Sequence, residues 1–295
     1  MKIWITGSQG MLGTDLAMAA ASREHDVVTT DKELDITDAA ALRAFAEKNE
    51  PTHIINCAAH TQVDACEVEK DLAARINGDG PAVLGALAKE LGIHAIQIST
   101  DYVFPGNAKA PYAEDAATGP LSVYGQTKLD GETRFLAALE NQGAVVRTSW
   151  LYGVHGKSFP QTMLKLMADK EELTVVDDQV GRPTYTADLA RALVEVAERK
   201  LTGVWHFANA GDVSWHGFAS AILESATKKG LPVKTKSIKA TTTAEYMKSR
   251  PAQAPRPAYS VLATTKIERA LGRQPRPWRQ ALDQYIDLVK VRGVG

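Results

Sequence analysis

KIWITGSQGMLG, residues 2–13, decides the fold of this chain. A short apolar run of strand-forming residues is followed at once by three glycines and then by a helical pattern. In this order Gly7 permits a tight turn, Gly10 lets the backbone approach a diphosphate, and Gly13 lets the helix pack on the strand. The free amides at the helix N-terminus then face the anion. The spacing departs by one residue from GxGxxG, and a merely flexible turn is the alternative.

The alternation of strand and helix continues along the first half of the chain. Strand-like runs over residues 26–31, 53–59, 94–99 and 143–150 are separated by helical stretches over 38–49, 67–91 and 122–141. The runs over residues 3–6 and 53–56 are apolar on both faces, as in central parallel strands covered by helices on each side. We therefore expect an α/β fold with an open, doubly wound parallel sheet.

Beyond residue 150 the alternation loosens. We expect a strand at 173–178, a helix at 186–200, a strand at 204–208, a helix at 215–229, a proline-rich loop at 249–260 and closing helices at 263–271 and 278–290. Residues 1–150 would form a dinucleotide-binding core, with 172–206 adding to its sheet. Residues 151–171 and 207–295 would form a smaller C-terminal substrate-binding lobe.

The composition favours a small-molecule partner. With 34 basic and 35 acidic residues the formal net charge is -1, so no global field attracts nucleic acid or an anionic membrane. The two cysteines, Cys57 and Cys66, lie in no metal-ligand pattern, and the histidines are scattered, so no metal site is predicted. The apolar run before Gly7 is too short for a signal peptide or a membrane span. We expect a cytoplasmic protein.

The end of the second strand bears on the choice of cofactor. Asp31 stands where a carboxylate can bond the ribose hydroxyls of an adenosine, which favours NADH. Lys32 follows at once and could instead meet the 2′-phosphate of NADPH. Asp35 and Ile36 begin a further loop that would border the adenine, with a solvated turn as the alternative. The sequence leaves NADPH and NADH both open.

Tyr124 and Lys128 form a YxxxK pair in a segment of helical character. The spacing sets both side chains on one helical face. A phenol with a pKa near 10 needs a neighbouring positive charge to transfer a proton at neutral pH, and the Lys128 ammonium would supply it. Thr100 ends the run HAIQIST, where the carboxyl ends of parallel strands carry ligands, and its hydroxyl would bond a substrate oxygen. These three residues predict a site for ketone reduction.

These parts resemble the extended short-chain dehydrogenase/reductase family, with its TGxxGxxG turn, hydroxyl residue after the fourth strand and YxxxK. Further segments look like those of dTDP-4-dehydrorhamnose reductases: NCAAHTQVDACE (56–67), STDYVFPG (99–106), VYGQTKLDGE (123–132), RTSWLYG (147–153), DDQVGRPTYTADLA (177–190) and RPAYSVL (256–262). The resemblance covers nearly the whole chain. It implies a Rossmann-like fold and reduction of the 4-keto group of dTDP-4-dehydro-L-rhamnose by NADPH or NADH.

The resemblance also implies site residues. Thr61, Val63 and Asp64 would approach nicotinamide or sugar, and Tyr102 would border the substrate. Trp150 would flank the hexose, although it could be a core aromatic, and Arg182 and Arg256 would serve the nucleotide diphosphate, although each could be a surface charge. The expected cofactor contacts are Gly7, Gln9, Gly10, Met11, Leu12, Gly13, Asp31, Asp35, Ile36, Ala58, Ala59, Thr61, Tyr124 and Lys128.

Three other functions stay open at this point. Sugar 4,6-dehydratases carry an acidic residue directly after Thr-Asp, and here Tyr102 holds that place, which favours a reductase. Another nucleotide-sugar reductase or an epimerase would use the same Tyr and Lys. A non-catalytic regulatory homologue is disfavoured because Thr100, Tyr124 and Lys128 are all present. A homodimer is left open, and Asp15 is not predicted to hold magnesium.

Overall fold

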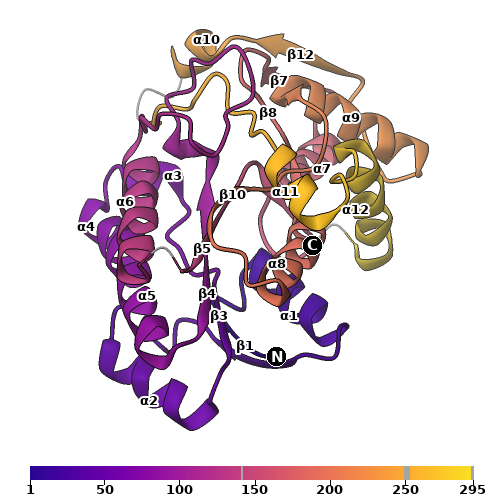
Figure 1. The fold of residues 1–295 in the computed structure, drawn as a ribbon. Helices are drawn as coiled ribbons and strands as arrows, with labels where there is room; N and C mark the ends of the chain where they lie inside the picture. Colours follow the sequence, from indigo (N-terminus) through magenta and orange to yellow (C-terminus); the bar gives the residue numbers. More distant parts are fainter. Residues whose placement is uncertain (141, 249–252, 294–295) are drawn as a thin grey trace.

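A six-stranded parallel sheet forms the centre of the computed structural model, which describes residues 1–140, 142–248 and 253–293 (Figure 1). The strands are β1 (Lys2–Thr6), β2 (Asp26–Thr30), β3 (His53–Asn56), β4 (His94–Thr100), β5 (Ala144–Thr148) and β10 (Gly203–His206). Their spatial order is β10-β5-β4-β3-β1-β2, with parallel pairing throughout. This order is that of a doubly wound sheet, which confirms the predicted fold class.

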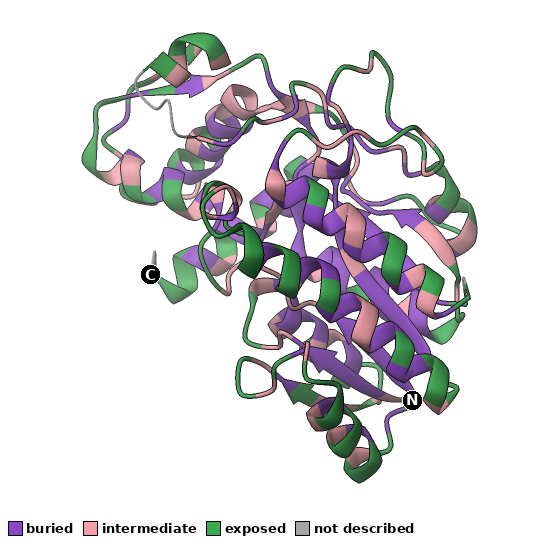
Figure 2. Cartoon of the chain, turned by 90° about the vertical axis from the view of Figure 1, so that its left-hand side faces the viewer, coloured by how far each residue is buried: buried purple, intermediate pink, exposed green. Residues whose placement is uncertain are grey.

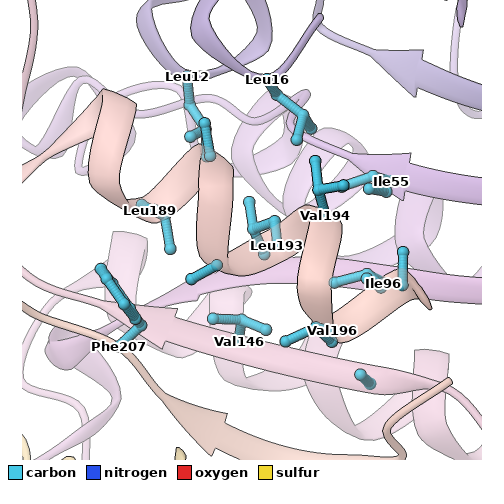
Figure 3. Packing of buried hydrophobic residues seen from close by; sticks show 14 of the residues in the cluster. Leu12, Leu16, Ile55, Ile96, Val146, Leu189, Leu193, Val194, Val196 and Phe207 are labelled. Carbon is cyan, nitrogen blue, oxygen red and sulfur yellow. The ribbon is translucent and has the colours of Figure 1, made fainter. Parts of the chain in front are cut away.

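Helices cover both faces of this sheet. One face carries α1 (Met11–Ala21), α8 (Thr186–Glu198) and α11 (Thr265–Leu271); the other carries α2 (Ala39–Asn49), α5 (Gly80–Leu91) and α6 (Val123–Ala138). Side chains of successive strand residues alternate between the faces. Ile3 and Ile5 therefore pack in the core beneath α1 and α8, and Trp4 packs in the core beneath α2 and α5. Figure 3 shows α1 and α8 packing their leucines and valines onto Ile55, Ile96 and Val146. In Figure 2 the strands are buried along most of their length, while the outer helix faces are exposed.

The C-terminal lobe has its own core. Its helices are α7 (Phe159–Asp169), α9 (Trp215–Lys228), α10 (Thr243–Lys248) and α12 (Trp278–Arg292), and its strands pair as β6 (Leu151–Tyr152) with β9 (Thr184–Tyr185), β8 (Val180–Gly181) with β11 (Val213–Ser214), and β7 (Glu172–Val176) with β12 (Ser237–Thr241). Aromatic residues dominate this core, among them Tyr152, Phe218 and Tyr285. The lobe lies beside the upper end of the sheet in Figure 1.

Residues 172–206 divide between the two parts. β10 joins the sheet beside β5, and α8 packs against α1. The expectation that this stretch adds to the sheet was wrong for its other strands, since β8 and β9 pair within the lobe and β7 pairs in parallel with β12. Leu173 and Val175 face the core of the lobe, and burial there fixes the strand beside a partner far along the chain.

The long helix expected over residues 67–91 is broken into shorter pieces. The chain forms α3 (Val63–Cys66), α4 (Lys70–Ala74), a π-helical turn (Arg75–Asp79) and then α5. Pro81 has no N–H to donate to the preceding turn, which favours a wider turn at this point. The turn has a structural use, because the Asn77 side chain accepts a hydrogen bond from the His60 N–H at 2.8 Å and donates one to its carbonyl at 3.0 Å. These bonds hold the segment that follows β3.

The remaining expected elements agree with the structure to within a few residues. The helix expected at 122–141 is α6, which ends at Ala138, and Asn141 lies outside the described residues. The proline-rich stretch at 249–260 lies outside them for residues 249–252, and its described part is neither helix nor regular strand. The last helix, α12, begins at Trp278 as expected.

Candidate active site

A cleft of ≈ 440 Å³ opens at the carboxyl ends of β1, β3, β4 and β5. The connections from β1 and β3 run in opposite directions along the sheet, and ligands of open α/β sheets bind at such a switch point. The cleft gathers most of the predicted site: Gly7, Gly10, Met11, Leu12, Gly13, Ala59, Thr61, Val63, Thr100, Tyr102, Tyr124, Lys128 and Trp150 all line it. Residues predicted separately from distant segments therefore share one space.

The glycine turn forms one wall of the cleft. Gly7 has a left-handed φ of 66°, and a Cβ there would lie 2.6 Å from the backbone nitrogen of Ala58. A Cβ on Gly13 would collide with the Gly7 carbonyl oxygen. Helix α1 starts after Gly10 with no side-chain cap on its first amides. Uncapped N–H groups beside glycines, where no side chain blocks approach to the backbone, fit a diphosphate.

The residues expected around the adenosine lie outside this cleft. Asp31 accepts a hydrogen bond from the backbone N–H of Gln9 at 2.8 Å, which ties the end of β2 to the glycine turn. Asp35 pairs with Arg75 at 2.6 Å, and its bonds to Thr37 and to this arginine lower the pKa of the carboxyl. Ile36 is buried in the core on the α5 face. The structure thus brings neither Asp35 nor Ile36 into the cleft.

The three residues predicted to react meet at the floor of the cleft. Thr100 ends β4, while Tyr124 and Lys128 lie on successive turns of α6, and each is at most 9% exposed. Helix α6 begins there because the Ser122 side chain accepts a bond from the Gly125 N–H at 3.2 Å. The Thr100 hydroxyl donates to Asp101 at 3.0 Å. The Lys128 ammonium donates to the Ile98 carbonyl at 2.7 Å, which fixes it below the tyrosine.

Burial controls the protonation states of these groups. It raises the pKa of the Tyr124 phenol, and a hydrogen bond with Thr100 opposes part of that rise. Burial lowers the pKa of Lys128 to about 8, against the opposite effect of the Glu132 carboxylate. At neutral pH the phenol keeps its proton and the amine is charged. These are the states needed to donate a proton to an alkoxide.

The charge of Lys128 predicts an alkaline limit to activity. Since its pKa is about 8 in the folded protein, the ammonium is present below that pH and is lost above it. We expect kcat/KM for the cofactor to fall as pH rises through about 8. Lys128→Arg should remove this alkaline fall in kcat/KM, because a guanidinium stays charged. Lys128→Met should lower kcat/KM across the whole pH range. A fall that persists in Lys128→Arg would assign it to another group.

Two stacked indoles form the wall opposite the catalytic residues. Trp150 has a left-handed φ of 47°, which is rare for a bulky residue, and its ring lies 3.6 Å from that of Trp215 with 4° between the planes. Gly181 makes room beneath the ring, since a Cβ there would lie 2.5 Å from the indole. Trp150 lines the cleft and is partly buried, with its side chain also packed against the core of the lobe. The part of the indole that lines the cleft suits an apolar sugar face.

A second cleft of ≈ 360 Å³ adjoins the first and shares Tyr102 and Trp215 with it. Arg256 lines this second cleft, and its guanidinium pairs with the Asp64 carboxylate at 2.6 Å. That arginine lowers the pKa of Asp64. Polar side chains of Gln179, Thr243 and Gln253 also line it. The second cleft therefore offers a cation and amide groups beside the reacting centre.

Arg182 is the predicted anion contact that the structure does not bring to either cleft. Its guanidinium pairs with Asp212 at 2.6 Å and donates to the Leu262 carbonyl at 3.0 Å. These bonds fasten the segment after β8 to the segment before α11. Its position is that of a structural cation.

Several residues that line the first cleft were not predicted from the sequence. Thr148 ends β5 and Ser149 follows it, and the same strand-end rule that selected Thr100 could have found them. Lys157 and Trp215 come from the lobe, and no local signal points to them. The full set of missed lining residues is Cys57, Ile98, Ser99, Asp101, Thr148, Ser149, Leu151, Lys157 and Trp215.

Three further observations concern Asp15, metal-ligating groups and apolar helices. Asp15, buried rather than solvated, accepts a bond from the Thr186 hydroxyl. Within residues 1–140, 142–248 and 253–293, no three or more His, Cys, Asp or Glu side chains are grouped to hold a metal ion. No helix in the described part of the chain is long and apolar enough to cross a membrane.

Comparison with known proteins places this site in a family. Residues 1–291 match the family model described as the RmlD substrate binding domain. A dTDP-4-dehydrorhamnose reductase of Streptomyces griseus is 40% identical over 95% of this chain and 91% of its own length. The solved structure of such a reductase from Clostridium acetobutylicum has a TM-score of 0.90 at 42% identity, covering 98% of this chain and 100% of that one.

A second solved structure shows a relative with a nucleotide bound. The dTDP-4-dehydrorhamnose reductase of Bacillus anthracis, in complex with NADP, is 36% identical, with a TM-score of 0.89 over 97% of this chain and 99% of that one. The match extends over the core and the lobe alike. The chain belongs to the family of the RmlD substrate binding domain.

Proposed function

We propose that this protein reduces the 4-keto group of dTDP-4-dehydro-L-rhamnose to give dTDP-L-rhamnose, with NADPH or NADH as the reductant. The observation that carries the proposal is the meeting of Thr100, Tyr124 and Lys128 in the cleft that begins at the glycine turn. The identity of the sugar nucleotide is taken from the relatives, which are named dTDP-4-dehydrorhamnose reductases. The glycine turn, where added Cβ atoms would collide with backbone, fits a dinucleotide diphosphate.

Three side chains of the protein have separate roles in the proposed reaction. A bound dihydronicotinamide supplies a hydride to the carbonyl carbon. When substrate binds, the Thr100 hydroxyl turns its single proton from Asp101 to the carbonyl oxygen, and Tyr124 transfers its phenolic proton to that oxygen as negative charge develops there. Lys128 stabilises the phenolate that is left behind, because its ammonium lies on the same face of α6. Burial of all three groups strengthens these interactions.

The substrate would extend from the first cleft into the second. Tyr102 and Val63 border the hexose, and the part of the Trp150 indole that lines the cleft packs against it. The diphosphate is bound by Arg256, with the Asp64 carboxylate holding the guanidinium in place. The nucleoside fills the second cleft. The proposal also assigns residues 1–150, α8 and β10 to cofactor binding and the rest of the chain to the substrate lobe. It includes a cytoplasmic location, which the two free cysteines favour.

The role of Arg256 predicts a split between kinetic constants. Arg256→Gln should raise KM for the nucleotide sugar about tenfold, since a hydrogen bond to a charged group contributes about 1.5–3 kcal/mol and the site is partly exposed. The value of kcat should change little, because the guanidinium lines the second cleft and not the first, which holds Thr100, Tyr124 and Lys128. Lys239→Gln on β12, which removes an exposed cation of the lobe, serves as the control. An unchanged KM would place the diphosphate elsewhere.

The activity itself is tested with purified protein, NADPH or NADH, and a panel of dTDP- and UDP-linked 4-keto sugars. We expect stoichiometric oxidation of the cofactor with dTDP-4-dehydro-L-rhamnose and a product identified as dTDP-L-rhamnose by mass and NMR. Turnover without net oxidation of cofactor would indicate an epimerase, and a preference for another keto sugar would indicate a different reductase. Cofactor binding without turnover on any substrate would indicate a regulatory homologue.

A further inference from the structure

We propose that Lys157, on the lobe, binds the diphosphate of the dinucleotide from the side opposite the glycine turn. The inference rests on the proposed use of a dinucleotide and adds a residue from the other half of the molecule. It makes the cofactor a bridge between core and lobe.

The loop that carries Lys157 lies against the glycine turn. It connects β6 with α7, and its Gly156 approaches Met11 so closely that a Cβ on that glycine would lie 2.9 Å from the Met11 Cγ. Met11 is the first residue of α1, whose uncapped amides face the cleft. Lys157 follows directly and lines the same cleft as Gly7 and Gly10. Its position is therefore next to the expected diphosphate.

A cation in this position would balance the negative charge of a bound diphosphate. The glycine turn, SQGMLGT over residues 8–14, contains no charged side chain. Lys128 is the other cation that lines the cleft, and its ammonium is bonded to the Ile98 carbonyl beneath the tyrosine. Lys157 is exposed, and within the described residues its ammonium has no hydrogen bond or ion pair. A dinucleotide diphosphate carries two negative charges, which the amides of a helix N-terminus compensate only in part.

The anchoring of the loop favours the cofactor over the sugar nucleotide as the source of the diphosphate. Phe159, two residues on, packs its ring 4.5 Å from that of Trp215, which fixes the start of α7. The loop thus stays beside Met11, whereas Arg256 serves the second cleft. One cation is available at each of the two expected diphosphate positions.

The test measures binding of each diphosphate separately. In Lys157→Gln we expect the Kd of NADPH, determined by fluorescence titration without sugar nucleotide, to rise about tenfold, with a shallower dependence on salt. Lys157→Arg should recover most of the affinity. The Kd of dTDP and the value of kcat at saturating cofactor should stay within twofold, and Lys165→Gln, at an exposed position on α7, should leave every constant unchanged.

Each other outcome has a defined meaning. An unchanged Kd of NADPH in Lys157→Gln, or a rise confined to dTDP, overturns the inference while leaving the proposed reductase intact. A wild-type protein that binds neither NADPH nor NADH overturns the proposed function instead. Thermal unfolding of each variant separates a lost contact from a misfolded chain.

Discussion

Tyr124→Phe should lower kcat by about two to four orders of magnitude, the usual range for losing a positioned proton donor. Phenylalanine keeps the ring, which packs edge-on against Tyr102 with centroids 5.5 Å apart, so the floor of the cleft is preserved. Only the transferable proton is removed. The Kd of NADPH should therefore match that of the wild type, and the loss should be seen in single-turnover measurements as well as in steady-state rates.

Tyr102→Phe is the matched control for this prediction. Tyr102 lines the same cleft, is partly buried, and has a phenol whose pKa burial raises, so it is the competing proton donor. Its hydroxyl lies near the Asp64–Arg256 pair, as the influence of both groups on its pKa shows. We expect its removal to raise KM more than it lowers kcat. If Tyr102→Phe were inactive and Tyr124→Phe active, the catalytic assignment would have to be exchanged.

The reacting residues could be predicted because their signals are local. A glycine turn between a strand and a helix, a threonine at a strand end and a YxxxK on a helix each require only a few neighbouring residues to interpret. The topology of parallel sheets then brings them together, since the carboxyl ends of the strands share one edge. The same rule would have found Thr148 and Ser149 at the end of β5.

The parts contributed by the lobe could not be predicted in this way. The pairing of β7 with β12 joins segments more than sixty residues apart, and nothing in either strand names its partner. Trp215 lines the site stacked on Trp150, whose left-handed backbone and closeness to Gly181 no local pattern predicts. Arg182 and Arg256 look alike in sequence, each within an RP dipeptide, yet one is tied to Asp212 and the other lines a cleft. Such differences depend on tertiary contacts.

Glu132→Gln should destabilise the protein by about 3–5 kcal/mol, because it leaves the Arg147 guanidinium buried without a counter-charge. The pair joins α6 to β5 through three bonds, from Arg147 Nε to Glu132 Oε1 at 2.9 Å and Oε2 at 3.1 Å, and from Nη2 to Oε2 at 2.7 Å. Both side chains are about 5% exposed. Thermal and denaturant unfolding measure the loss. The exposed pair of Lys236 and Glu171, with side chains about three-quarters exposed, gives the control, and Glu171→Gln should shift neither transition measurably.

A second variant separates the buried charge from the contact. Replacing both partners, with Glu132→Leu and Arg147→Met, removes the unpaired charge, so the double variant should lose less stability than Glu132→Gln. Glu132 also lies one turn from Lys128 and raises the pKa of that amine. Removing the carboxylate should therefore move the alkaline limb of kcat/KM to lower pH at temperatures where the variant is folded. A stability loss without this shift would show that the ion pair fastens α6 to the sheet but does not tune the catalytic amine.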